Sequence, residues 1–253
     1  MTMEFKNPPW HFGVQHAGTI NNWLPSDTED HYKQLIKDSA HRDYFEEQGW
    51  NQPGAITYKI NSHGFRCDEF NTEPCMIALG CSFTLGTGLP LDDIWPTLVG
   101  QALGFKVYNL AWGGNGADTC FRLAEYWLPR LSPKLVCMLT PPEARIELLL
   151  DGASWNKSEV FMAESQSAWF SPADIYLKHW FVNDENARLN SLKNKLAIKE
   201  LCNQQQIPFI AYDSMKEMSQ SREEVGYARD YMHAGPIGHR MLADKIIRDY
   251  HVR

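Results

Sequence analysis

Residues 75–86 read Cys75-Met76-Ile77-Ala78-Leu79-Gly80-Cys81-Ser82-Phe83-Thr84-Leu85-Gly86. The run 75–80 is apolar on both faces, which is typical of a parallel strand covered by helices. A serine that directly follows such a strand, with glycines on both sides, can sit at a tight strand-to-helix turn with its hydroxyl exposed. A plain serine N-cap in a glycine-rich turn is the alternative. This stretch predicts a strand, a sharp turn and a helix start, with Ser82 as a candidate functional residue.

Other apolar runs of strand length alternate with helical segments along the chain. The expected strands cover residues 56–60, 106–111, 134–140 and 207–213, and the expected helices cover 94–103, 117–130, 173–205 and 236–250. This alternation predicts right-handed crossovers and a three-layer α/β/α fold built on a doubly wound parallel sheet. Ligands bind beyond the carboxyl ends of the strands in such sheets, so we expect the loops after residues 80, 111, 140 and 213 to surround one crevice.

Residues 1–55 differ in character from the rest of the chain. They are rich in Trp, His, Pro and Asn, and they contain one helical stretch. That stretch opens with the capping-box pattern Ser26-Asp27-Thr28-Glu29 and continues through residues 31–38. We therefore expect an irregular N-terminal extension over residues 1–55 and a single α/β domain over residues 56–253.

The composition excludes several classes of function. The 253-residue chain has 24 Lys and Arg against 31 Asp and Glu, a formal net charge of −7, and no basic cluster. Nucleic-acid binding needs clustered cations, so no nucleic-acid partner is expected. No apolar run approaches the roughly 20 residues that span a bilayer, and the N-terminus has no apolar export region. We expect no membrane partner and a cytoplasmic location.

Metal and disulfide chemistry are also not expected. The six cysteines are scattered without a C-x-x-C pair, and free buried thiols are favoured over disulfides or a zinc site in such a chain. The histidines at positions 11, 16, 31 and 41 have no metal-ligand spacing with nearby carboxylates or cysteines, and they are interpreted as incidental. The sequence does not indicate an oligomeric state.

A candidate general base lies near the C-terminus, in the segment Asp230-Tyr231-Met232-His233-Ala234-Gly235-Pro236. A nucleophilic serine needs a base, and that base needs a carboxylate to orient it. Asp230 and His233 can lie side by side in one turn, so that the carboxylate fixes the imidazole tautomer while the other ring nitrogen faces Ser82. An isolated Asp-x-x-His pattern is more typical of a surface turn, but its position before the last helix favours the functional interpretation.

These blocks together resemble the SGNH/GDSL hydrolase superfamily over residues 56–250. The family's first block, Gly-Asp-Ser-x-Thr-x-Gly, and its last block, Asp-x-x-His, are matched by Gly80, Ser82, Thr84, Gly86, Asp230 and His233. The glycine of the second block is best matched by Gly114, in the segment Asn109-Leu110-Ala111-Trp112-Gly113-Gly114-Asn115-Gly116. Residues 61–66 look like the lead-in of a bacterial branch of the family.

The resemblance implies a flavodoxin-like fold and hydrolysis of a small-molecule ester. Ser82 would attack the carbonyl carbon, His233 would act as the general base, and Asp230 would orient the imidazole. The N–H groups of Ser82 and Gly114 would bind the oxyanion. No metal or organic cofactor is implied.

Two departures from the family pattern bear on activity. Cys81 stands where the family has Asp, and the third block, normally Gly-x-Asn-Asp, reads Thr140-Pro141-Pro142-Glu143-Ala144-Arg145. Losing one oxyanion donor costs roughly 2.7–4 kcal/mol of transition-state stabilisation. Asn115, Thr140 and Arg145 are the candidates to replace the missing asparagine. The two hypotheses are therefore a serine esterase, with an acetylated carbohydrate favoured as substrate, and a catalytically lapsed module that binds or assembles.

Weaker candidates remain beside these. Cys81 is an alternative nucleophile, although a buried thiol is the favoured interpretation. His239 is an alternative base or a structural residue, and Asp213 either binds substrate or caps a turn. Aromatic residues of the 141–172 loop and Trp112 are either a sugar platform or part of the core, and that loop is expected to select the substrate.

Overall fold

Four parallel strands form the central sheet. The computed structural model describes residues 8–149, 158–162, 184–218 and 222–252. The sheet has the order β4-β3-β5-β8 and consists of β3 (Cys75–Leu79), β4 (Lys106–Asn109), β5 (Leu135–Thr140) and β8 (Phe209–Asp213). All residues of β3 and β5 are buried, as expected for inner strands with apolar side chains on both faces.

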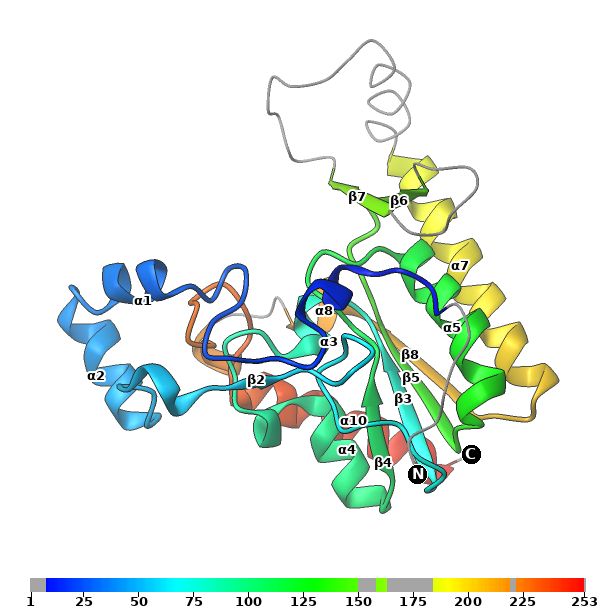
Figure 1. Ribbon diagram of the computed structural model, residues 1–253, viewed down its shortest axis with the longest axis horizontal. Coiled ribbons are helices and arrows are strands. Elements are labelled where there is room, and N and C mark those ends of the chain that lie inside the picture. The colour runs from blue at the N-terminus through cyan, green and yellow to red at the C-terminus, as the bar shows by residue number, and fades with distance from the viewer. Residues whose placement is uncertain (1–7, 150–157, 163–183, 219–221, 253) are drawn as a thin grey trace, which may run out of the picture.

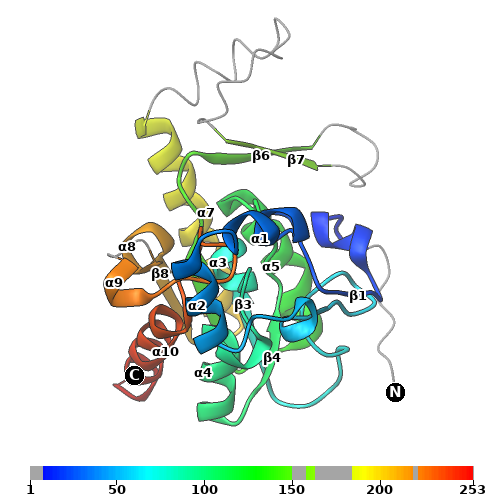
Figure 2. The ribbon, with the colours of Figure 1, turned by 90° about the vertical axis from the view of Figure 1, so that its left-hand side faces the viewer.

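Helices cover both faces of the sheet (Figures 1 and 2). One face carries α5 (Ala117–Leu131) and α7 (Asp184–Gln204), and the other carries α4 (Trp95–Leu103) and α10 (Pro236–Val252). A separate hydrophobic core fills the space on each face of the sheet. Trp127 belongs to the core under α5 and α7, and Trp95 belongs to the core under α4 and α10. The predicted three-layer, doubly wound α/β/α fold is confirmed. Of the helix expected over 173–205, the part before residue 184 lies outside the described residues.

The N-terminal segment contains more regular structure than predicted. It holds η1 (Phe12–His16), β1 (Ile20–Asn21), α1 (Glu29–Leu35), α2 (Ser39–Glu47) and η2 (Pro53–Ala55). Helix α1 begins at Glu29 because Thr28 is the N-cap, and its side chain accepts the N–H of His31. The helix start predicted at Ser26 is therefore wrong. Asp38, which caps α2, was not recognised.

The strand expected over residues 56–60 does not join the central sheet. Only β2 (Tyr58–Lys59) forms, and it pairs antiparallel with β1. The reason lies in its pattern, since Tyr58 is buried and Lys59 is exposed. A strand with one apolar face suits a sheet that is solvated on one side, whereas the inner strands of a doubly wound sheet are apolar on both.

The remaining elements are short and surround the carboxyl ends of the strands. They are α3 (Ser82–Leu85), η3 (Leu91–Asp93), the antiparallel hairpin of β6 (Arg145–Leu149) and β7 (Ser158–Met162), α8 (Ser214–Met218) and α9 (Arg222–Val225). The hairpin lies in the upper part of Figure 1, above the central sheet. Because all four central strands are parallel, the loops after residues 80, 109, 140 and 213 meet at one rim of the sheet.

All six cysteines are free and buried, as predicted. In the described part of the chain, no helix has both the length and the apolar character that a membrane span requires.

Two buried histidines make the fold sensitive to acid. Nδ1 of His239 accepts the N–H of Trp95 at 3.0 Å, and burial lowers the pKa of His239 to about 3. Burial also lowers the pKa of His11 to about 4. Below pH 6.5 the unfolded chain binds these protons while the folded chain does not, so stability is lost as the pH falls.

We predict that the free energy of unfolding decreases by up to about 1.4 kcal/mol per pH unit for each buried histidine below about pH 6. In His239→Asn, whose side-chain oxygen can still accept the N–H of Trp95, one of these two contributions disappears. Urea unfolding between pH 7 and pH 4.5 measures the slope. The control is His251→Asn, at an exposed position near the end of α10, which keeps the wild-type slope. An unchanged slope in His239→Asn would contradict the prediction.

Candidate active site

Ser82 occupies a sharp turn between β3 and α3. It is the first residue of α3, it is half-buried, and Cys81 is the extended N-cap residue before it. The turn requires Gly80, because a Cβ at that position would lie 2.1 Å from Oγ1 of Thr84. Gly86 ends α3 with a left-handed φ of 76°. The predicted strand, sharp turn and helix start are confirmed.

Asp230 and His233 lie on a closed loop before α10. The loop is tied at its base by a bridge between Tyr227 and Ala234, and the N–H of Ala228 donates to the carbonyl of His233 at 3.1 Å. Within the loop, Oδ1 of Asp230 accepts the N–H groups of Met232 and His233, each at 3.1 Å. These bonds hold the carboxylate and the imidazole side by side.

The three side chains form one hydrogen-bonded row. Nδ1 of His233 lies 2.6 Å from Oδ2 of Asp230, and Nε2 of His233 lies 2.7 Å from Oγ of Ser82. Because the carboxylate accepts the Nδ1 proton, the lone pair of Nε2 faces the serine hydroxyl. The ring of Phe83 packs edge-on against His233, with 4.9 Å between centroids. The structure thus brings together the three residues predicted to act as nucleophile, base and orienting acid.

Asp230 carries its negative charge in a site without exposure to water. Burial alone would raise its pKa. The hydrogen bond and charge of His233 and the N–H groups of Met232 and His233 outweigh burial, so the pKa of Asp230 lies below its usual value. The carboxylate is therefore ionised at neutral pH and can stabilise a positive charge on His233.

The turn after β4 lies beside Ser82. A Cβ on Gly113 would be 4.0 Å from Cβ of Ser82, and Gly114 has a left-handed φ of 87° that favours glycine. Neither the N–H of Ser82 nor that of Gly114 donates to another described residue. Both N–H groups therefore have no partner in the described structure, and an oxyanion site requires free donors of this kind.

The three residues considered as replacements for the missing asparagine have different surroundings. Asn115 is buried, and its Nδ2 donates to the carbonyl of Gly80 at 3.2 Å, so its amide braces the Ser82 turn. Nη1 of Arg145 donates to the carbonyl of Asn115 at 3.3 Å. Thr140 is 5% exposed, and its hydroxyl has no partner among the described residues.

The weaker candidates make contacts that are typical of structural residues. Cys81 is completely buried, and buried His239 accepts the N–H of Trp95. Oδ1 of Asp213 accepts the N–H of Lys216 at 3.0 Å, and this bond caps α8. Trp112 is 4% exposed and belongs to a core cluster. Positions 155 and 169, the other tryptophans considered for a sugar platform, lie outside the described residues.

Two residues near Asp230 were missed by the sequence analysis. Oγ of Ser26 donates to Oδ2 of Asp230 at 3.0 Å, and Nε2 of His31 donates to the carbonyl oxygen of Asp230 at 2.9 Å. His31 had been interpreted as incidental. No motif links either residue to a loop about 200 positions away, so only the fold could reveal these contacts.

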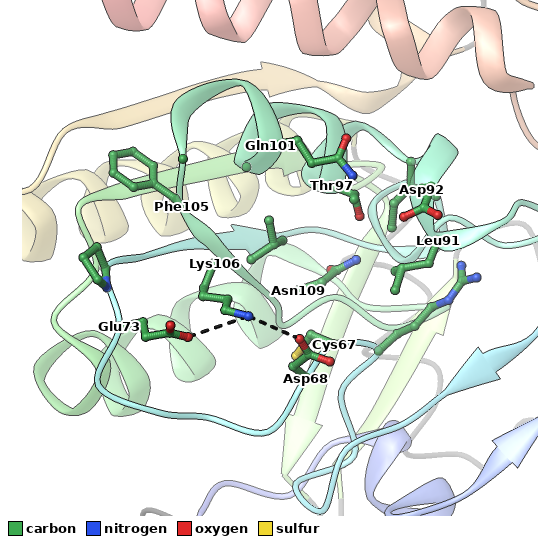
Figure 3. Close-up of a pocket in the computed structure, with 16 residues that line it drawn as sticks. Cys67, Asp68, Glu73, Leu91, Asp92, Thr97, Gln101, Phe105, Lys106 and Asn109 are labelled. Carbon is green, nitrogen blue, oxygen red and sulfur yellow. Dashed lines mark ion pairs between the residues drawn. The ribbon is translucent and has the colours of Figure 1, made fainter.

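A separate cavity of about 530 Å³ lies along edge strand β4 (Figure 3). Lys106 projects between Asp68 and Glu73 and pairs with both at 3.7 Å, so its charge is compensated. Ser82, Asp230 and His233 are not among the residues that line this cavity. It is therefore distinct from the site around Ser82.

No family model matches the chain, and no curated protein sequence matches it significantly. Among similar solved structures, a protein described as lipolytic and of the G-D-S-L family, from Desulfitobacterium hafniense DCB-2, has 16% identity over 70% of this chain and 99% of its own, with a TM-score of 0.34. A psychrotrophic esterase from Pseudoalteromonas sp. has 11% identity over 72% and 100%, with a TM-score of 0.37. The lipase/acylhydrolase from Enterococcus faecalis has 14% identity over 70% and 94%, with a TM-score of 0.33.

These three are lipolytic proteins and ester hydrolases, the class that the sequence motifs resemble. At TM-scores below 0.5 such likenesses do not establish an activity for this chain. Its function has to follow from its own residues.

The row predicts that Ser82 is a reactive nucleophile. A fluorophosphonate probe should label Ser82 in the wild type, and labelling should slow by roughly 10² to 10⁴ in His233→Ala, because the general base is lost. Mass spectrometry of the labelled peptide gives the site and the rate. His251→Ala, which removes an exposed imidazole, is the control and should label like the wild type. Equal labelling rates in His233→Ala and wild type would show that the imidazole does not activate the hydroxyl.

Proposed function

We propose that the protein is a serine ester hydrolase of the SGNH/GDSL type that acts on a small ester. The observation that carries this proposal is the row from Asp230 through His233 to Ser82, with bonds of 2.6 Å and 2.7 Å. A serine hydroxyl bonded to an imidazole that a buried carboxylate orients is the arrangement used for nucleophilic attack on carbonyl carbon.

The proposed reaction has two steps. His233 takes the proton of Ser82 as Oγ attacks the ester carbonyl, while Asp230 stabilises the imidazolium that forms. The oxyanion accepts the N–H groups of Ser82 and Gly114, and His233 then gives its proton to the leaving alcohol. Water, activated by the same imidazole, subsequently hydrolyses the acyl-serine and regenerates the site.

Thr140 is the best-supported replacement for the missing third donor. Leu79 of β3 pairs with Met138 of β5, so the two strands end at the same rim, where Thr140 is the last residue of β5 and the Ser82 turn follows β3. Its hydroxyl is buried and has no partner among the described residues, and a buried donor without a partner is costly unless a ligand uses it. Asn115, by contrast, already donates to Gly80.

A second candidate function is a binding or assembly module that has lost catalysis. Pro141 and Pro142 favour it, since they stand in the third block and offer no N–H to an oxyanion. An acetylated carbohydrate is the favoured substrate of the first candidate, because the 141–172 loop mixes aromatic and acidic residues and lacks a long apolar run. Most of that loop lies outside the described residues.

Turnover of 4-nitrophenyl acetate tests the hydrolase proposal. Ser82→Ala should reduce kcat/KM to background and leave Tm nearly unchanged, because the side chain is half-buried and loses one hydroxyl. Cys81→Ala is the matched neighbour and should retain most of the turnover. Activity that survives in Ser82→Ala and disappears in Cys81→Ala would move the nucleophile to the thiol.

The carbohydrate preference has a separate test. We expect kcat/KM to be highest for acetyl esters and to fall from acetate through butyrate to octanoate, with acetate released from acetylated sugars. The measurement is a series of 4-nitrophenyl esters beside acetate release from acetylated mono- and oligosaccharides. An increase in kcat/KM with acyl length would instead indicate an extended apolar groove and a lipid-like substrate.

A further inference from the structure

The carboxylate of Asp230 receives a hydrogen bond from the far end of the chain. Its Oδ2 accepts both Nδ1 of His233 at 2.6 Å and Oγ of Ser26 at 3.0 Å, and Ser26 lies 204 positions earlier in the sequence. Its Oδ1 accepts the N–H groups of Met232 and His233. An ionised carboxylate has about four acceptor positions, and here four donors occupy them.

A buried ion pair fixes Ser26 at this position. The next residue, Asp27, accepts two hydrogen bonds from Arg229, at 2.9 Å and 2.7 Å, and the pair is almost completely buried. Tyr58 also donates to Asp27. Asp27 and Arg229 thus pair directly beside Ser26 and Asp230, so two adjacent contacts set the register between the N-terminal segment and the loop of the base.

The backbone of Ser26 is held in a conformation that disfavours serine. Its φ is +72°, in the left-handed region where glycine is the preferred residue. A serine kept in such a conformation is most simply explained by its hydroxyl, since backbone strain is commonly retained where a side chain contributes to a functional site.

From these contacts we infer that Ser26 is a positioning residue of the active site: its hydroxyl orients the Asp230 carboxylate and shares its negative charge with His233. The inference rests on the proposed function, because it assigns Ser26 a role in the same reaction. The N-terminal segment thereby completes the acid part of the catalytic row.

The inference fixes the sign of a pH effect. Without the Ser26 hydroxyl, more of the negative charge of Asp230 acts on His233, so the protonated imidazole is stabilised and persists to higher pH. The base must be neutral to act, and the acidic limb of kcat/KM should therefore move to higher pH. The other titratable or charged groups around the pair are His239, the His31 side chain that donates to the carbonyl of Asp230, and the Asp27–Arg229 ion pair beside Ser26 and Asp230.

The experiment compares Ser26→Ala and Ser26→Gly with the wild type. Both variants remove the donor, but glycine suits the left-handed backbone, so Ser26→Gly should lose less stability than Ser26→Ala. We expect both to move the acidic limb up by about 0.3–1 pH unit and to lower the plateau kcat roughly two- to tenfold. Thr19→Ala, which removes an exposed hydroxyl from the same segment, should change neither quantity.

A second readout does not depend on turnover. The pH at which His233 takes up a proton can be followed by NMR through its Hε1 resonance, and it should rise in both Ser26 variants. The same titration in a His31→Gln background removes the contribution of the neighbouring imidazole. A lower Tm in Ser26→Ala, together with an unchanged protonation pH of His233 in Ser26→Gly, would show that Ser26 has only a structural role and would overturn the inference.

A failure of the proposed function would give a different set of results from a failure of the Ser26 inference. In that case the wild type would show no ester turnover and no fluorophosphonate labelling. The NMR titration would still show whether Ser26 acts on the Asp230–His233 pair, because it reads the protonation of the imidazole directly.

Discussion

The buried negative charge of Asp230 is the constraint on which the rest of the site depends. A carboxylate withdrawn from water is costly unless hydrogen-bond donors replace the solvent, and Asp230 has no exposed surface. Two backbone N–H groups, the imidazole of His233 and the hydroxyl of Ser26 supply these donors. The same bonds that make the charge tolerable also hold the imidazole in one tautomer and aim its free nitrogen at Ser82. Stability of the buried charge and alignment of the row therefore have a common origin.

The sheet supplies the other half of the geometry. Parallel strands end at one rim, and β3 delivers Ser82 there through a turn that only Gly80 permits, because Thr84 occupies the space a side chain would need. The loop of the base reaches the same rim because α10 packs on the sheet face that also carries α4. Gly88 allows the two loops to approach, since a Cβ there would meet the backbone N of Arg229 at 3.0 Å. Close backbone approach and buried charge thus act together to fix the distance between the Ser82 hydroxyl and the His233 imidazole.

Sequence reasoning predicted the parts of this arrangement that depend on local pattern. The apolar runs located the four central strands along the chain, and the glycine-flanked serine and the Asp-x-x-His spacing singled out Ser82, Asp230 and His233, which the structure brings together. It failed where tertiary contacts override local preference. Residues 26–29 match a capping box with Ser26 as the N-cap, yet Ser26 and Asp27 bond to Asp230 and Arg229. The N-cap is therefore Thr28, and the helix starts two residues later than the motif suggests. The sequence made the Asn115 amide a candidate donor to the oxyanion, but in the fold this amide donates to the carbonyl of Gly80.

The role of the N-terminal segment follows from the same interactions. One core cluster combines Leu24, Phe45 and Ile60 with Leu85 and Ala228, so it spans the boundary at residue 55 that composition suggested. A hydrophobic cluster holds surfaces together without fixing their register to within a hydrogen bond. The buried Asp27–Arg229 pair supplies that register, because a misaligned pair would leave two charges without partners away from water. The apolar cluster holds the two surfaces together, and the ion pair aligns them. Together they position the Ser26 hydroxyl to donate to the Asp230 carboxylate. These two kinds of contact explain why a segment without catalytic motifs lies within hydrogen-bonding distance of the row formed by Asp230, His233 and Ser82.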